Sequence, residues 1–187
     1  MSLLKEQCER FGVSIWAYCF MPNQVHLIAV PKDEHGLASA IGETHRRYTV
    51  YINQKMDWRG HLFQDRFFSY AADDQMILRA ARFIETLPVT AGIAPKADSY
   101  LWSSARSHIR LKEDPLVKNS PLPSFVAEWG QYLDRPMDPR ELELIQTHLQ
   151  TGRPRGSDSF LDDIEKMIGR TVRPQRRGRK PKWKQVA

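Results

Sequence analysis

The sequence has few cysteines, no long apolar run and no internal repeat, and each absence excludes a class of protein. Cys8 and Cys19 are its two cysteines among 187 residues. They are too few for a disulfide framework and are not spaced as a C-x-x-C motif. We expect both thiols to be reduced and buried. No segment approaches the roughly 20 apolar residues of a membrane span, and the charged start, MSLLKEQCER, is unlike a signal peptide. We therefore predict a cytoplasmic protein without a membrane partner.

Basic residues are few in most of the sequence and accumulate at the C-terminal end. Residues 1–150 contain 17 Lys+Arg and 18 Asp+Glu, a net charge of −1. Residues 151–187 contain 11 basic and 4 acidic residues, a net charge of +7. A near-neutral body with a basic tail indicates a polyanionic partner, most simply nucleic acid. A solvated tail that only keeps the protein in solution would have the same composition, so charge alone leaves both interpretations open.

The composition, 41% hydrophobic and 10% aromatic, is that of a globular domain with a buried core. Pro22 and Asn23 form a turn signal between two apolar runs, which predicts a β-hairpin. Asp73 is a helix N-cap candidate, and Pro88 is expected to break or end the helix that follows. The elements expected in the first half are helices at 3–11, 36–55 and 74–87, and strands at 13–21, 24–30 and 61–72.

The second half of the sequence alternates between proline-rich or glycine-rich stretches and helical patterns. A short ordered segment is expected at 98–110, and the prolines of 111–125 indicate a linker. Apolar spacing then predicts helices at 128–133 and 139–149, with another linker at 151–156. Ser159 can cap a last short helix that stops at Gly169. The basic end that follows has a composition typical of disorder.

One histidine stands inside an apolar strand, in the stretch YCFMPNQVHLIAVP. Residues i and i+2 of a strand project from the same face, so Gln24 and His26 are predicted to point the same way. An imidazole nitrogen and an amide oxygen can both bind a divalent metal ion. A lone histidine on an apolar strand is more often simply packed and hydrogen-bonded, so the pair by itself does not define a metal site.

Three segments in this order resemble the IS200-like transposase family, most closely its REP-associated branch of single-tyrosine HUH nucleases. They are YCFMPNQVHLIAVP, HRRYTVYINQKMDWRGHLFQDRF and ARFIETLPVTAGIAPKADSYLWSSA, and the segment GRPRGSDSFLDDIEKMIGRTVRPQRRGRKPK is similar to the C-terminal extension of that branch. The resemblance implies an α+β fold, with a ferredoxin-like antiparallel sheet and packed helices. It implies a transposase domain at 1–110, a linker and helical extension at 111–150, and a short helix with a basic tail at 151–187.

The resemblance also implies a chemistry, in which two strand histidines hold Mg²⁺ or Mn²⁺ and a tyrosine hydroxyl attacks single-stranded DNA beside an imperfect hairpin. Carried onto this sequence, His26 matches the second histidine, but Gln24 stands at the first. Phe83 stands at the tyrosine, and Leu87 stands at an asparagine that is a further metal ligand. Phe83 has no hydroxyl, and Leu87 has no lone pair. Together these departures predict that cleavage by the family route is lost, and that a metal ion is no longer needed.

An active enzyme with a substitute nucleophile is the alternative, because four tyrosines lie in the matched segments: Tyr48, Tyr51, Tyr70 and Tyr100. We expect each of them instead to be a core or rim aromatic residue. The histidines at 45, 61 and 108 have no spacing that favours a metal, so we expect ordinary surface histidines. Glu85 is two residues from Phe83 and does not share its helix face.

DNA binding is the function that the resemblance leaves in place. Basic residues interleaved with Trp58, Phe63 and Phe67 suit single-stranded or hairpin DNA, although we expect the two phenylalanines to pack on the sheet. In RRGRKPK, two arginines flank a glycine as in an AT-hook, which implies an A·T-rich minor groove as a further target. The predicted DNA-binding residues are Arg46, Arg47, Arg59, Arg66, Arg177 and Arg179, with Arg79 and Arg82 near the same face.

The start of the chain departs from the family pattern, which opens with a strand before the first helix. Here the sequence begins within that helix, so we expect the N-terminal strand to be missing from this sequence. Short family members are dimers that share active sites, whereas REP-associated members act alone, so a monomer and a homodimer both stay open. A DNA partner also implies association with the nucleoid.

Overall fold

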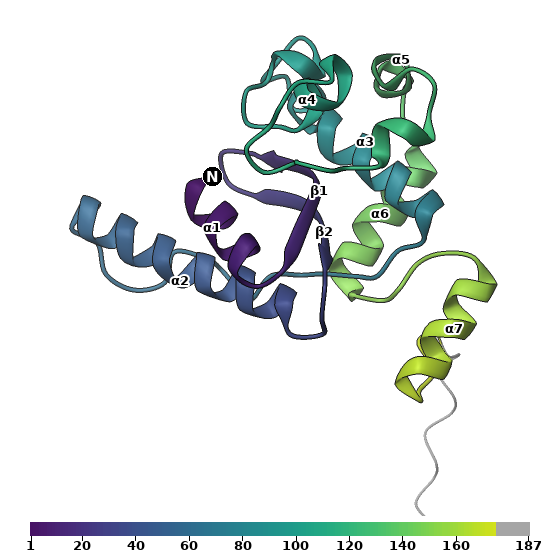
Figure 1. Ribbon diagram of the computed structural model, residues 1–187, viewed down its shortest axis with the longest axis horizontal. Helices are drawn as coiled ribbons and strands as arrows, with labels where there is room; N and C mark the ends of the chain where they lie inside the picture. The colour runs from purple at the N-terminus through teal and green to yellow at the C-terminus, as the bar shows by residue number, and fades with distance from the viewer. Residues whose placement is uncertain (175–187) are drawn as a thin grey trace, which may run out of the picture.

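The computed structural model describes residues 1–174 and has the predicted α+β architecture. An antiparallel hairpin of β1 (Val13–Phe20) and β2 (Val25–Pro31) lies at its centre, with helices against both faces (Figure 1). It is the one sheet in the described part of the chain. The helices are α1 (Ser2–Arg10), α2 (Gly36–Met56), α3 (Asp74–Thr90), α4 (Ala105–Arg110), α5 (Trp129–Asp134), α6 (Pro139–Thr151) and α7 (Asp158–Ile168), with short 3-10 turns at Ala97–Ser99 and Leu122–Phe125.

A β-bulge in β1 decides which residues face which helices. Ile15 lies opposite Ala29 and Ala17 lies opposite Ile28, so that Trp16 is left without a partner in the ladder. The bulge shifts the alternation of β1, because Ile15 and Tyr18 then lie in one core cluster and Ala17 in the other. Both faces of the hairpin are therefore buried.

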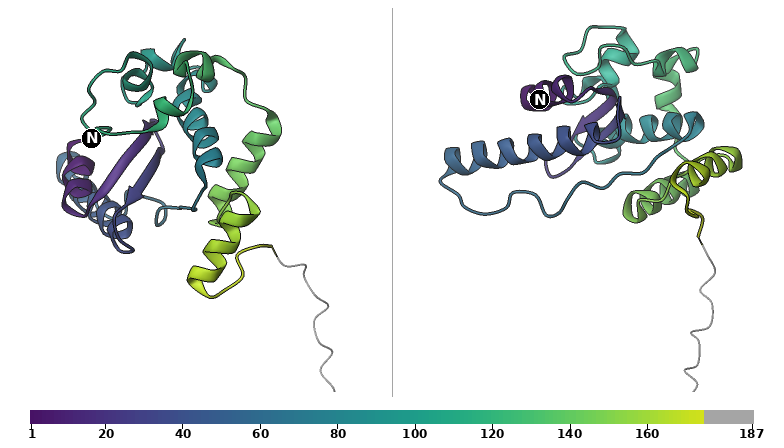
Figure 2. Two further views of the ribbon diagram at one scale, coloured as in Figure 1. Left: turned by 45° about the vertical axis from the view of Figure 1, so that its right-hand side comes forward. Right: turned by 60° about the horizontal axis from the view of Figure 1, so that its bottom comes forward.

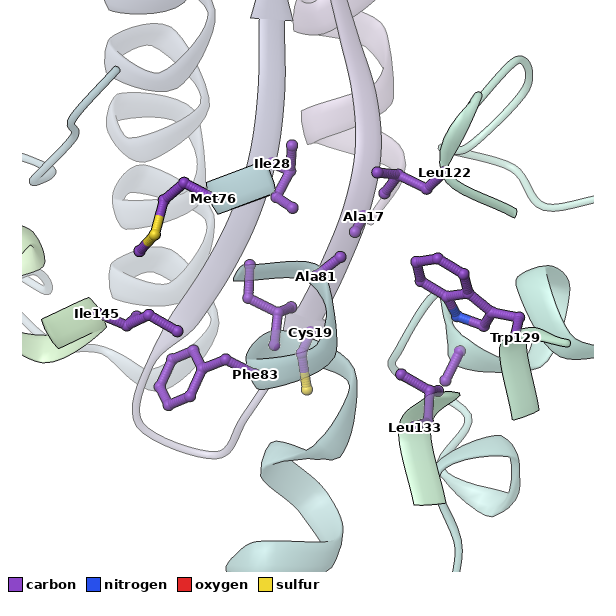
Figure 3. Packing of buried hydrophobic residues seen from close by; sticks show 12 residues of the cluster. Ala17, Cys19, Ile28, Met76, Ala81, Phe83, Leu122, Trp129, Leu133 and Ile145 are labelled. Atoms are coloured by element: carbon purple, nitrogen blue, oxygen red, sulfur yellow. The ribbon is translucent and has the colours of Figure 1, made fainter. Parts of the chain in front are cut away.

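The first core cluster lies between the hairpin and α3 (Figure 3). Ala17 and Ile28 from the strands meet Ala81 and Phe83 from α3, and the C-terminal helices close the cluster with Trp129, Leu133 and Ile145.

The second core cluster lies on the opposite face, where α1 and α2 cover the hairpin. Residues 111–125, expected to be a linker, contribute Leu116 and Val117 to it. The Tyr18 hydroxyl donates to Asp114 Oδ2 at 2.9 Å and holds this segment on the hairpin. Cys8 and Cys19 are free thiols, both buried, as expected. Burial raises the pKa of Cys19 to about 12, because the thiolate would lose its hydration.

The predicted strand at 61–72 is wrong, because those residues form a loop. Its apolar side chains pack separately: Phe63 stacks on His45 of α2 with ring centroids 3.7 Å apart, and Phe67 packs against the second cluster. One isolated parallel bridge pairs Ala72 with Arg155. The alternating pattern of 61–72 therefore marks side chains that pack one by one against the body of the protein, and it does not mark a strand paired in a sheet.

Two helix ends also differ from the sequence prediction. α3 runs through Pro88 to Thr90. Pro88 lies in the last turn and is buried, so the helix loses a single hydrogen bond there and keeps its packing. Ser157, and not Ser159, caps α7, because its Oγ accepts from the amide of Phe160 at 3.3 Å.

The stretch 151–156, expected to be a linker, is docked on the start of α3. Asp73 Oδ1 accepts from the amide of Met76 at 2.9 Å, and its Oδ2 accepts from the amide of Ser157 at 2.7 Å. The amide of Asp73 donates to the carbonyl of Arg155, whose own amide donates to Ala71. One aspartate thus caps α3 and anchors the segment that leads into α7. Within residues 1–174, no helix is both long and apolar enough to cross a membrane.

Candidate functional site

The predicted site residues His26 and Phe83 lie next to each other, where β2 faces α3. His26 stands opposite Cys19 in the hairpin, two residues before the buried Ile28. Phe83 reaches the same core layer from the middle of α3 (Figure 3). The two rings meet at 89° with centroids 5.7 Å apart, the edge-to-face arrangement that aromatic pairs prefer. The structure therefore brings together two of the four positions singled out in the sequence.

The imidazole of His26 is held in an apolar setting. Its Nε2 is buried and has no hydrogen-bond partner within the described residues. Burial lowers the pKa of His26 from its ordinary value of 6.5, because the charged form would lose its hydration. The ring is therefore neutral at physiological pH, with Nε2 facing protein.

Gln24 does not share the environment of His26. It precedes the first residue of β2, its side chain is exposed, and its carbonyl accepts from the amide of Met21 at 2.8 Å to close the hairpin turn. Leu87 is half-buried and packs against the first core cluster. Of the predicted strand pair, His26 packs against the core residue Phe83, whereas Gln24 is exposed.

A buried polar network lies on the adjacent face of α3, and the sequence analysis missed it. Glu85 is fully buried and accepts from Ser104 Oγ at 2.5 Å and from Trp129 Nε1 at 2.7 Å. His108 Nδ1 lies 2.6 Å from Glu85 Oε1. His108 is only 4% exposed, so its assignment as a surface histidine is wrong. One signal was available: a lone carboxylate within the apolar run FIETLP indicates a buried, paired acid.

The network fixes α3 across the hairpin. Ser104 Oγ accepts from the amide of Tyr18 at 2.9 Å, and the amide of Ser104 donates to the carbonyl of Tyr18 at 3.0 Å. Glu85 is thus connected to the backbone of β1 through one hydroxyl. Because Phe83 lies two residues before Glu85, this connection also sets the position of the Phe83 ring beside His26.

Two of the predicted DNA-binding arginines lie on α2 and are ion-paired. Arg46 lies 2.7 Å from Glu43, and Arg47 pairs with both Glu43 and Glu6 of α1. Their guanidinium groups hold the pKa of the Glu43 carboxyl down to about 2. Two arginines share Glu43, and most of the Arg46 side chain is exposed.

The remaining predicted arginines fall into three groups. Arg59 and Arg66 are exposed on the loop after α2. Arg79 and Arg82 both pair with Glu141 and tie α3 to α6. The AT-hook-like pair, Arg177 and Arg179, lies outside the described residues.

Among the described residues, the aromatic ring that pairs with His26 is that of Phe83 and not of a tyrosine proposed as a substitute. Tyr48 and Tyr51 are exposed on α2. Tyr70 packs on the first core cluster, and burial raises its pKa to about 12. The Tyr100 hydroxyl donates to the carbonyl of Phe20 at 2.8 Å, beside the hairpin turn.

The fold and the site geometry together define a small α+β domain in which His26 of β2 packs against Phe83 of α3. The family model described as Transposase IS200 like matches residues 1–86, a segment that ends within α3. This part of the chain therefore belongs to the IS200-like transposase family. Comparisons with curated proteins and with solved structures found no significant match.

Proposed function

We propose that this chain is a DNA-binding protein of the transposase family that no longer cleaves DNA by the family's tyrosine route. The DNA that it binds is single-stranded or forms a hairpin. DNA transposition by strand cleavage and transfer is the ancestral role of the fold.

The edge-to-face contact between Phe83 and His26 carries this proposal. At the helix position where the family has a tyrosine, a hydrocarbon ring packs on the imidazole with centroids 5.7 Å apart. Attack on phosphorus needs an oxygen nucleophile, and Phe83 has none. The ring also fills the core layer, so that no polar group of α3 takes its place at His26.

The residues at this site do not fit Mg²⁺ or Mn²⁺. Both ions prefer oxygen ligands in near-octahedral geometry. Here His26 offers one buried nitrogen, and Gln24 lies in solvent outside the strand. Glu85 is occupied by Ser104, Trp129 and His108. In the described part of the chain, no group of three or more His, Cys, Asp or Glu side chains could hold a metal ion. We infer that this copy works without the family's cation.

Retained DNA binding is supported by the exposed cations. Three exposed cations lie within residues 46–66: Arg46 on α2, and Arg59 and Arg66 on the loop that follows it. Cations of this kind release counterions when they bind phosphates. The basic sequence at the C-terminal end adds positive charge.

A labelled hairpin oligonucleotide with single-stranded flanks tests the proposal. We expect the full-length protein to shift the oligonucleotide in a native gel. After incubation with Mn²⁺, we expect no protein–DNA adduct in a denaturing gel. An adduct mapped to any tyrosine would support the active-enzyme alternative, and no shift at any concentration would contradict DNA binding.

A second experiment restores the inherited site. In Phe83→Tyr/Gln24→His, a phenol and a second imidazole return to the family positions, and we expect detectable adduct with Mn²⁺. Phe83→Tyr alone is the matched control, because it adds the nucleophile without the second ligand. An adduct from the unmodified protein, at the level of the double variant, would overturn the proposed loss of cleavage.

A further inference from the structure

The C-terminal half of α2 extends beyond the body of the molecule. Figure 1 shows this end of the helix projecting past α1, and the right-hand view of Figure 2 shows the same projection. The first half of α2 is buried through Ala40 and Ile41 in the second core cluster. The second half leaves Tyr51 and Met56 exposed. The helix therefore continues well past the residues that it helps to bury.

On the C-terminal half of α2, aromatic side chains occupy the helix face that is buried nearer the start of the helix. Tyr48 follows Ile41 by seven residues and Tyr51 follows Ala40 by eleven, about two and three turns, so both lie on the face that is buried nearer the start of the helix. Yet Tyr48 is 41% exposed and Tyr51 is 51% exposed. Their rings stack with centroids 6.5 Å apart and an angle of 28°. Phe63 from the following loop also lies against Tyr48, with ring centroids 6.2 Å apart. Both tyrosines nevertheless keep a large exposed fraction where a core contact would be expected.

Positive charge and a third ring gather at the same end of the helix. Lys55 Nζ lies 5.8 Å from the centroid of the Tyr51 ring. Trp58 is 55% exposed, and its amide donates to the carbonyl of Asn53 at 2.9 Å. The side chain of Asn53 donates to the carbonyl of Gly60 at 3.0 Å, which folds residues 58–60 against the last turn of α2. Arg59 lies within this fold and is exposed.

We propose that Tyr48, Tyr51 and Trp58 form a platform on which unpaired bases of single-stranded DNA stack. Lys55 and Arg59 contact the phosphates between those bases. This inference rests on the proposed function and names where on the chain an unpaired strand lies. Bases stack on aromatic side chains regardless of sequence, and cations beside the rings neutralise the backbone. In a duplex the bases are already stacked on each other, so the platform selects unpaired DNA.

Charge argues for DNA over a second copy of the chain as the occupant. Lys55 and Arg59 outnumber the one acid between them, Asp57. A two-fold contact through the same stripe would bring together two surfaces of the same net positive charge, because symmetric dimers use identical surfaces. A polyanion with flat apolar bases complements both features of the stripe.

Fluorescence anisotropy with the full-length protein tests the platform. The probes are a labelled oligothymidylate of about 12 nucleotides, within the range that single-strand sites cover, and a duplex of the same length. We expect Tyr48→Ala/Tyr51→Ala to weaken binding of the single strand about tenfold. Tyr48→Phe/Tyr51→Phe keeps the rings and should bind as the unmodified protein does. Val50→Ala is the matched control, because Val50 is exposed on the opposite side of the same helix.

The salt dependence separates rings from cations. Tyr48→Ala/Tyr51→Ala should leave the slope of affinity against salt unchanged, whereas Lys55→Gln should reduce it by about 0.7, the value for one single-strand phosphate. Equal affinity of the alanine variant and the unmodified protein would overturn the platform and leave the proposed function standing. Failure of the unmodified protein to bind these probes and the hairpin oligonucleotide would contradict the proposed function itself. If light scattering shows a dimer that Tyr48→Ala/Tyr51→Ala converts to a monomer, the stripe is a contact between copies, and the platform is wrong.

Discussion

Trp129 donates from its indole Nε1 to Glu85 Oε2 at 2.7 Å, across 44 residues of sequence. Both side chains are buried. Glu85 lies within the segment that matches the transposase family, and Trp129 lies beyond it. The family domain and the helices that follow it are therefore joined by a buried hydrogen bond.

The first prediction concerns this bond. Trp129→Phe keeps an aromatic ring but removes the donor, so that one carboxylate oxygen of Glu85 is left buried without its partner. We expect the free energy of unfolding to fall by about 1–3 kcal/mol, measured by urea denaturation. Trp102→Phe is the control, because Trp102 is 54% exposed, and it should change stability by less than about 0.5 kcal/mol. Equal losses in the two variants would contradict the assigned role of the bond.

The second prediction compares two glycines. A Cβ on Gly156 would lie 2.5 Å from Phe160 Cδ1 and 2.7 Å from Asp73 Oδ2. Gly156→Ala should therefore loosen the docking of α7 on Asp73 and make residues 153–157 a site of faster proteolysis. Gly42 lies inside α2 with nothing within 4 Å of its Cβ position, so Gly42→Ala should raise stability by about 0.5–1 kcal/mol. Thermal unfolding and limited trypsin digestion measure both, and unchanged digestion of Gly156→Ala would argue against the docked segment.

The third prediction is a pH dependence that arises from His26. Burial holds its pKa below the ordinary value of 6.5 in the folded protein. At pH values below about 6.5, His26 binds a proton more readily in the unfolded chain than in the folded chain. The free energy of unfolding therefore falls as the pH is lowered from 7.5 to 5.5. His26→Leu should show a smaller loss between the two pH values in urea denaturation.

His45 makes a contribution of the same sign, because burial lowers its pKa as well. His45→Gln, measured at the same two pH values, shows how much of the decrease in stability belongs to that second histidine. An identical decrease in His26→Leu and in the unmodified protein would mean that His26 is charged in the folded state, which would contradict the apolar setting assigned to it.

The fourth prediction concerns the basic end of the chain. Arg173 pairs with Asp162 and Glu165 of α7, so a cut after Pro174 removes the tail without disturbing that ion pair. The residues removed, 175–187, contain six basic and no acidic side chains. We expect weaker binding of duplex DNA, with a salt dependence reduced by about 0.9 for each phosphate that the tail neutralises in the full-length protein. An unchanged slope would exclude the tail from DNA binding.

The sequence pattern located most elements of the family domain but not their partners. The hairpin, α1, α2 and the cap of α3 at Asp73 all follow from local signals: a turn pair, apolar periodicity and a side chain that accepts from nearby amides. The false strand at 61–72 shows the limit of the method. An alternating pattern indicates which side chains become buried, but it does not say against what; Phe63 packs on His45 of α2 and not on a neighbouring strand.

The candidate site divides in the same way. That His26 and Phe83 belong to one site was predicted from the family resemblance, and the chemistry of each follows from its residue type. The burial of His26 Nε2 and the separation of Gln24 from it depend on where the hairpin turn ends. Glu85 and His108 are 23 residues apart in the sequence, and no local sequence pattern predicts the contact between their side chains.

By itself the sequence determined which groups this protein can and cannot use: no hydroxyl at position 83, one histidine where the family has two, and an excess of cations near its end. Only the tertiary structure decided which side chains are buried and which are exposed to solvent. It buried Glu85 and His108 in a shared network and left the side chains of Tyr48 and Tyr51 partly exposed. The physical reason is that residue type sets the chemistry of a side chain, whereas desolvation depends on contacts between segments far apart in the chain.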